Sequence, residues 1–210
     1  MLVREWMTAS PVTVHGDTPV MEAMQLLRDG GYRRLPVVDA ERLVGIVTDR
    51  DLKEATPSSA TTLSVYELNH LLARMRVRDV ASAPVVTVRD DDEIERAALR
   101  MEEHRVSGLP VVDADGALCG IVTITDLLRA FVMILGMREG GVRVTVDVPD
   151  EPGVLARVAG AAAPSNIVAS VTAQVRTGAT RRLVLRVAGD DAASFPERLR
   201  QAGLEASDVR

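Results

Sequence analysis

An internal repeat constrains the fold of this chain more than any other feature, because its 210 residues must hold two copies of one structural unit. The run LPVVD at residues 35–39 recurs at residues 109–113, 74 residues later. The run GIVT at residues 45–48 recurs at residues 120–123, 75 residues later, so the turn before it has gained one residue. Repeated units of this size bury their apolar faces against one another. We therefore expect the two copies to pack as a pseudo-symmetric pair.

Each copy is expected to fold in the order strand, helix, strand, strand, helix. Apolar residues at the spacing i, i+3, i+4 and i+7 indicate the first helix of each copy. They are Val20, Ala23, Met24 and Leu27 in the first copy and Ile94, Ala97, Ala98 and Met101 in the second. Pro19 suits the first helical position, and Asp92 is predicted to cap the second helix. The expected strands are residues 12–14, 35–38 and 43–48, and residues 86–88, 109–112 and 118–123. Their nearly continuous Val and Ile content suits strands covered by helices, in an α+β or α/β fold.

Composition excludes several classes of function. Hydrophobic residues make up 47% of the chain but aromatic residues only 2%, so aliphatic side chains must fill the core. The net charge of −5 argues against a nucleic-acid partner, which would need a basic stripe. Residues 1–8 show no signal peptide, and the apolar stretch at residues 131–135 is far too short to span a bilayer, so we expect a cytoplasmic protein with no membrane partner. One cysteine and three histidines without ligand spacing predict no metal site and no cofactor.

The element with the most chemical content is Gly-Ile-Val-Thr-x-x-Asp, at residues 45–51 and again at residues 120–126. Its threonine (Thr48 or Thr123) ends a strand, and its aspartate (Asp51 or Asp126) opens the following helix. The hydroxyl can donate to a phosphate oxygen, and the helix N-terminus adds backbone N–H groups there. The carboxylate can accept from two ribose hydroxyls, so the motif indicates a sugar-phosphate clamp without a nucleophile or a base. The alternative is that the aspartates are only helix caps and the threonines only strand ends.

These motifs resemble the CBS domain, and the tandem pair resembles a Bateman module, over roughly residues 1–135. The resemblance implies that an adenine nucleotide or S-adenosylmethionine binds in two clefts between the repeats. It implies one cleft served by Ile46, Thr48 and Asp51 and a second served by Ile121, Thr123 and Asp126, with the isoleucines against the base.

Three arginines distinguish the first repeat from the second. Arg33 and Arg34 stand where the family often places phosphate-binding residues, and Arg50 lies inside the Thr-x-x-Asp motif. The matching positions in the second repeat are Ser107, Gly108 and Thr125. Because contacts from arginine to phosphate are charge-assisted, we predict that these arginines mark the phosphate end of the preferred cleft. Two alternatives stay open: the arginines are solvated surface charge, or phosphates are reached from the opposite repeat.

The C-terminal third predicts a second domain after a break at Gly140 and Gly141. Valines alternate with polar residues over residues 142–148, which is typical of a half-buried strand. The remaining pattern predicts helices at residues 154–162 and 195–202 and strands at residues 167–175, 183–187 and 204–209.

The resulting order, βαββαβ, resembles the ferredoxin-like ACT domain, with residues 146–155 (VDVPDEPGVL) and Asn166-Ile167 as the matching runs. The resemblance implies an amino-acid-like effector bound at a dimer interface, with Asp150, Gly153 and Asn166 as the candidate contacts. The alternative is that the Pro152-Gly153 pair only shapes the turn and that the domain serves dimerisation alone.

The sequence thus divides into a first CBS repeat (residues 1–55), a linker (56–76) with a predicted helix, a second repeat (77–136) and an ACT domain (140–210). This arrangement resembles the bacterial acetoin-utilisation accessory proteins. We expect a regulatory, homodimeric protein that senses an adenosine-containing small molecule and is not an enzyme, since no catalytic set converges by spacing. The alternative is a dimeric scaffold that binds a protein partner without a ligand switch.

Overall fold

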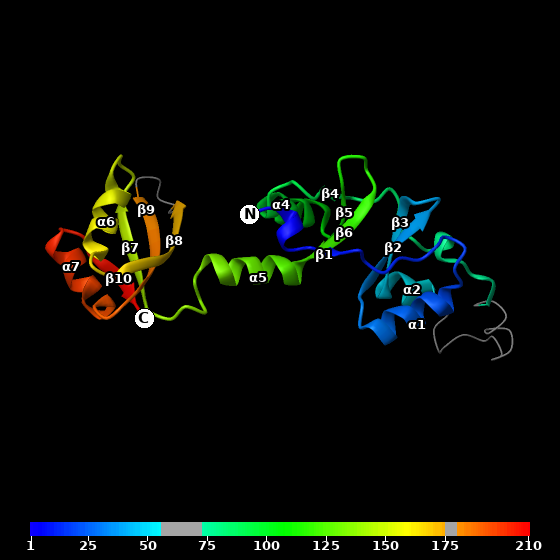
Figure 1. Cartoon of the computed structure of the whole chain (residues 1–210), viewed down its shortest axis with the longest axis horizontal. Helices are drawn as coiled ribbons and strands as arrows, with labels where there is room; N and C mark the ends of the chain where they lie inside the picture. The colour runs from blue at the N-terminus through cyan, green and yellow to red at the C-terminus, as the bar shows by residue number, and fades with distance from the viewer. Residues whose placement is uncertain (56–72, 175–179) are drawn as a thin grey trace. The chain divides into compact units, whose positions relative to one another are not determined.

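The computed structural model describes residues 1–55, 73–174 and 180–210. The chain divides into two compact units, Met1–Leu127 and Leu128–Arg210, which are described separately (Figure 1). The predicted linker helix falls almost entirely on residues 56–72, outside the described residues. Among the helices that the structure describes, none is long and apolar enough to cross a membrane.

The two repeats contain the elements that the periodicity predicts, but the leading strand of each differs from the expected residues 12–14 and 86–88. The first repeat holds α1 (Val20–Gly30), the hairpin of β2 (Arg34–Asp39) and β3 (Arg42–Thr48), and α2 (Asp49–Ala55). The second holds β4 (Val88–Arg89), α4 (Ile94–His104), β5 (Gly108–Val112), β6 (Leu118–Thr123) and α5 (Ile124–Ile134). The strand expected at residues 12–14 is wrong in extent, because only Val14 pairs, in an isolated parallel bridge to Val37. Its counterpart β4 pairs with β5 over two residues.

The helix starts differ from the predicted caps. Glu93, not Asp92, is the residue before α4, and it makes no side-chain capping hydrogen bond. The Asp92 carboxylate instead accepts from the backbone N–H of Arg89 at 2.9 Å, which closes the preceding turn. Pro19 likewise precedes the first residue of α1 rather than occupying it.

The leading segment of each repeat pairs with the other repeat. At the N-terminus η1 (Val3–Glu5) is followed by β1 (Thr8–Ala9), and β1 pairs with β6, with Thr8 opposite Ile121. The equivalent segment η2 (Val77–Asp79) leads to an isolated bridge between Ser82 and Ile46 of β3. The sheet order β1-β6-β5-β4 therefore includes a strand from the first copy. This exchange makes the two repeats one module.

The core of the first repeat is aliphatic, as the composition requires. Its buried residues come from α1, the β2–β3 hairpin, α2 and η2, and they are Val14, Val20, Ala23, Leu27, Leu35, Val37, Val47, Leu52 and Val77. Val77 is fully buried in this core although it belongs to the second repeat in the sequence. Packing thus reinforces the exchange that the strand pairing shows.

The second unit has the βαββαβ order that its sequence predicts. Its elements are β7 (Val142–Pro149), α6 (Val154–Ala162), β8 (Asn166–Gln174), β9 (Thr180–Ala188), η3 (Ala192–Ser194), α7 (Phe195–Gln201) and β10 (Ala206–Val209). The strands form an antiparallel sheet in the order β10-β7-β9-β8. Figure 1 shows α6 and α7 on one face of this sheet, and their Val158, Phe195 and Leu199 share a core with Val144 and Val146 of β7.

Candidate functional site

The two Thr-x-x-Asp motifs form the same local structure at the ends of β3 and β6. The backbone N–H and the hydroxyl of Thr48 donate to Oδ2 of Asp51 at 2.8 and 2.7 Å. Those of Thr123 donate to Oδ2 of Asp126 at 2.9 and 2.7 Å. The hydroxyl proton that we expected to reach a phosphate is therefore directed to the carboxylate, which is a charged acceptor within the same turn. The threonine oxygen can still accept a hydrogen bond.

The aspartates of these junctions differ in exposure. Asp126 is 4% exposed and lines neither of the cavities described below, whereas Asp51 is half-buried and lines one of them. In the described part of the chain, Oδ1 of Asp51 accepts no hydrogen bond, so it can take one from a sugar hydroxyl. Of these two cavities, one is bordered by a junction carboxylate, that of Asp51.

One cavity of the described part of the first unit, the Ile46 cavity, has a volume of about 570 Å³. Its first-repeat wall includes Ile46, Thr48 and Asp51, and its second-repeat wall includes Val86 and Pro110. The volume falls within the range typical of small-molecule sites. The structure therefore brings together the three residues predicted for one cleft, against the opposite repeat.

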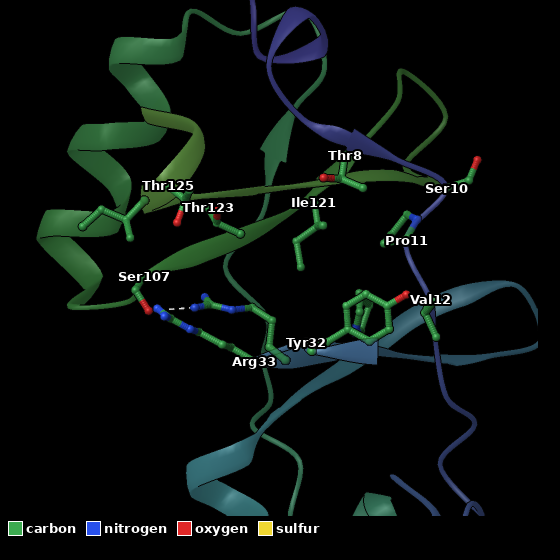
Figure 2. Close-up of a pocket in the computed structure, with 14 residues that line it drawn as sticks. Thr8, Ser10, Pro11, Val12, Tyr32, Arg33, Ser107, Ile121, Thr123 and Thr125 are labelled. Carbon is green, nitrogen blue, oxygen red and sulfur yellow. Dashed lines mark hydrogen bonds between the residues drawn. The ribbon is translucent and has the colours of Figure 1, made fainter. Parts of the chain in front are cut away.

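A second cavity, the Ile121 cavity, has a volume of about 370 Å³. Ile121 and Thr123 line it from the second repeat, while Val12 and Pro36 line it from the first, where they match Val86 and Pro110 of the other cavity. Figure 2 shows Arg33 and Ser107 at one end of this cavity, Tyr32 and Val12 at the other end, and Ile121 between them. The cavity therefore has a polar, cationic end and an apolar end.

Arg33 and Arg34 line both cavities, so they do not mark a single cleft. Nη2 of Arg34 donates to Oγ of Ser107 in the opposite repeat at 2.7 Å. Its Nε is buried and has no hydrogen-bond partner among the residues that the structure describes. Burial, and then the charge of Arg33, lower the pKa of Arg34. A charge disfavoured in this way is stabilised by an anion.

The third predicted arginine, Arg50, lines only the Ile46 cavity. Its Nε lies 3.5 Å from Oε1 of Glu54, and its side chain is 84% exposed. Arg105, at the position of Gly31, also lines this cavity and was not singled out from the sequence. The Ile46 cavity thus has basic residues of its own.

Tyr32 is a cavity residue that the sequence analysis missed. Its ring lies at the apolar end of the Ile121 cavity and is available to stack on a planar ligand (Figure 2). Gly30 leaves room for the ring, because a Cβ there would lie 2.0 Å from Cε2 of Tyr32. The available signal was an aromatic residue beside two arginines, in a chain that is only 2% aromatic.

The three candidates in the second unit are placed less favourably for a ligand. Nε of Arg181 donates to Oδ1 of Asp150 at 2.6 Å, and this hydrogen bond raises the pKa of Arg181. Gly153 precedes α6 with a φ of 86°, and Asn166 is exposed at the start of β8. None of the three is among the residues that line the Ile46 cavity, the Ile121 cavity or the two further hollows beside β9 and β10 in the described part of the chain. Within that same part, no cluster of three His, Cys, Asp or Glu residues could hold a metal ion.

Two family models match the chain. The CBS domain model matches residues 3–58 and 77–133, and the model of the TTHA0829-like ACT domain matches residues 140–210. A CBS domain-containing protein of Dictyostelium discoideum is 36% identical over 136 residues, which are 64% of this chain and 94% of that protein. L-aspartate semialdehyde sulfurtransferase of Methanocaldococcus jannaschii is 30% identical over 62% of this chain, but the match covers only 23% of that enzyme.

Solved structures resemble the repeat region. The CBS domain pair of protein MJ0100, in complex with 5′-methylthioadenosine and S-adenosyl-L-methionine, is 30% identical with a TM-score of 0.52, over 62% of this chain and 99% of its own. CBSX2 of Arabidopsis thaliana, in complex with AMP, is 34% identical with a TM-score of 0.52, over 63% and 97%. A putative acetoin utilization protein (AcuB) from Vibrio cholerae is 29% identical with a TM-score of 0.54, over 66% and 96%.

Proposed function

Since this chain belongs to the CBS domain family and carries a TTHA0829-like ACT domain after its repeats, we propose that it is a regulatory protein that senses an adenosine-containing ligand. The matches confirm both domain types that the sequence motifs indicate. The match covers only 23% of L-aspartate semialdehyde sulfurtransferase, so the activity of that enzyme is not carried over to this chain. The proposal includes no catalytic step.

The observation that carries the proposal is the pair of cavities at equivalent strand-to-helix junctions. Each cavity has an isoleucine of the repeated motif, Ile46 or Ile121, on one wall and a proline of the opposite repeat on the other. Each also borders the same two guanidinium groups. An apolar slot that ends in positive charge suits a base joined to a phosphate or another polar group. The solved complexes of MJ0100 and CBSX2, which hold adenosine compounds, support this class of ligand.

The geometry suggests an orientation for the ligand. In the Ile121 cavity the base would lie between Ile121 and Tyr32, and a phosphate would point toward Arg33. In the Ile46 cavity the free Oδ1 of Asp51 would accept from a ribose hydroxyl, while Arg50 would lie near the phosphate. Thr48 and Thr123 would shape the junctions and offer acceptors rather than donors.

Isothermal titration with AMP and with adenosine tests this function. Ile46→Trp and Ile121→Trp each place an indole in one cavity, so each variant should lose binding at that cavity and keep it at the other. Leu99→Trp, on the exposed face of α4, is the matched control and should bind as the wild type does. The proposal is contradicted if neither compound binds to the wild type, or if all three variants bind AMP and adenosine equally.

A sensor must also change state when it binds, since a ligand shifts an equilibrium only by its different affinity for two states. Small-angle scattering and mass measurement with and without AMP should therefore differ. Identical profiles at saturating AMP would favour the alternative, a homodimeric scaffold.

For the second unit we propose an amino-acid-like effector or a second copy of the chain as the partner, near Asp150, Gly153 and Asn166. The match to the ACT domain family supports this assignment. Gly153 precedes α6, and the N-terminus of a helix favours a carboxylate. Mass measurements with single amino acids added would separate an effector from dimerisation alone.

A further inference from the structure

The two cavities share one pair of arginines, and this sharing has a consequence for how they fill. We infer that a phosphate-bearing ligand in one cavity weakens the binding of a second phosphate-bearing ligand in the other, whereas an uncharged adenosine compound escapes this penalty. The inference rests on the proposed function and adds a rule for joint occupancy of the same sites.

The pair is not duplicated by the repeat. Arg33 and Arg34 match Ser107 and Gly108 in the second copy, and neither of these carries a charge. Both arginines line both cavities. The chain therefore has two copies of the Thr-x-x-Asp junction but one copy of its central cationic group.

The Ile121 cavity depends on this pair completely. Among its described lining residues, Arg33 and Arg34 are the only charged ones. The Ile46 cavity adds Arg50 and Arg105, together with two aspartates. A phosphate in the Ile46 cavity can therefore keep some cationic contacts when the pair is engaged elsewhere, but a phosphate in the Ile121 cavity cannot.

Arg34 is held at the boundary between the repeats. Its Nη2 donates to Ser107 at 2.7 Å, and the absence of a side chain at Gly108 makes room for the guanidinium. A Cβ at Gly108 would lie 2.4 Å from Nη1 of Arg34. In the described part of the chain, neither Arg33 nor Arg34 has a carboxylate partner. Within that part, the pair thus places two positive charges without ion-pair partners between the two cavities, and the Arg34 side chain is held there by Ser107.

Two physical effects then act in the same direction. A guanidinium has five N–H donors in a fixed fork, so donors turned to one phosphate are lost to the other. Two phosphates near the same pair also repel each other, and this repulsion is weakly screened where water is partly excluded. Coupling between two binding sites is reciprocal, so a phosphate-bearing ligand in either cavity lowers the affinity of the other cavity for a second one.

The test compares two-site titrations of AMP and adenosine at low salt. Ile46→Trp and Ile121→Trp each leave one cavity open, so the ratio of their AMP dissociation constants measures the intrinsic difference between the cavities, including the part due to Arg50 and Arg105. The ratio of the two AMP dissociation constants of the wild type should exceed this intrinsic ratio by tenfold or more, whereas for adenosine the two ratios should agree. Adenosine added to protein that holds one AMP should still fill the remaining cavity, and Ile46→Trp and Ile121→Trp assign which cavity that is.

Substitutions and changes in salt concentration test whether the two arginines and the phosphate charge cause the coupling. In the double variant Arg33→Gln/Arg34→Gln, the AMP ratio should fall to the intrinsic ratio that Ile46→Trp and Ile121→Trp give in the same background. Arg28→Gln, on α1 and away from both cavities, is the matched control and should keep the wild-type AMP ratio. Raising the salt concentration should shrink the AMP ratio of the wild type, a measurement that requires no substitution.

A wild-type AMP ratio equal to the intrinsic ratio from Ile46→Trp and Ile121→Trp would overturn the coupling and leave the proposed function intact. An AMP-bound protein that excludes adenosine would also overturn it, because the penalty would not come from the phosphate. Failure of both compounds to bind would instead refute the proposed function itself.

Discussion

Asp51 and Asp126 accept the same two hydrogen bonds from the threonine three residues before them, but their surroundings differ. Asp126 is 4% exposed, while Asp51 is half-buried at the wall of the Ile46 cavity. A buried carboxylate that loses its charge leaves its donors poorly satisfied, and water cannot replace it. The same residue type at the same motif position therefore serves stability in one repeat and is available to a ligand in the other.

Asparagine substitutions should separate these roles. Asp126→Asn should lower the free energy of unfolding by about 1–3 kcal/mol, because it weakens two charge-assisted hydrogen bonds in a buried site. Asp51→Asn should cost less, because water reaches that side chain. Urea unfolding followed by the fluorescence of Trp6, the single tryptophan, measures both. Equal losses in the two variants would contradict the difference in burial.

The internal repeat predicted which cavity residues of the first copy match those of the second, but it did not predict all of their contacts. Ile46, Thr48 and Asp51 do line one cavity, since an unbroken motif fixes their register at the strand end. The direction of the threonine hydroxyls was not predictable, because it depends on which acceptor is nearest after folding. Tyr32 and the shared position of Arg34 depend on contacts across the repeats, which no local pattern contains.

At the scale of the element, α1 and α4 end in the same left-handed conformation with different residues. Gly31 ends α1 at a φ of 64°, and Arg105 ends α4 at a φ of 54°. Glycine adopts this conformation without strain, whereas a side chain costs about 1 kcal/mol there. The cost at Arg105 accompanies the placement of its side chain beside the Ile46 cavity.

Gly31→Ala should therefore destabilise the first unit by about 1 kcal/mol. A Cβ at Gly31 meets no atom within 4 Å, so the loss would be conformational rather than steric. Gly160→Ala is the matched control, because that position lies within α6, has no positive φ and is equally open. It should stabilise the protein by about 0.5–1 kcal/mol, as measured by urea unfolding. A loss at both positions would refute the explanation.

Helices and buried strands were predictable because their apolar periodicity is set by their own residues. The two helices and four strands of the C-terminal unit follow the expected order for the same reason. The predictions that were wrong concern short elements and caps. Residues 12–14 make only one bridge, and the Asp92 carboxylate closes a turn instead of capping α4. In both cases a competing local contact determines the structure, and the strength of that contact cannot be inferred from the sequence pattern.

At the scale of the whole first unit, Val3 and Val77 occupy equivalent positions in the exchanged segments, and both are fully buried. The backbone N–H of Val3 donates to the carbonyl oxygen of Asp92 in the second repeat, and that of Val77 donates to the carbonyl oxygen of Thr18 in the first. The sequence places each valine in one repeat, but packing assigns it to the other. Repetition alone could not predict this, because both copies carry the same local signals.

Val3→Ala and Val77→Ala should each lower the free energy of unfolding by about 1.5–3 kcal/mol, since each removes buried methyl groups and leaves a cavity. The two losses should be similar, and each should shift one common urea transition of the first unit, measured by Trp6 fluorescence. Thr13→Ala, on an exposed side chain of the first repeat, is the control. A negligible effect of Val3→Ala would show that the N-terminal segment is not part of the module.

The pairing of Thr8 with Ile121 also bears on biosynthesis. During translation, Thr8 and Ala9 must wait for a partner strand that is made more than 100 residues later. The first repeat is likewise incomplete until residues 76–82 emerge. A nascent chain that stops between the repeats would expose unsatisfied strand edges and apolar surface, so chaperone contact during translation should end only when β6 has been made.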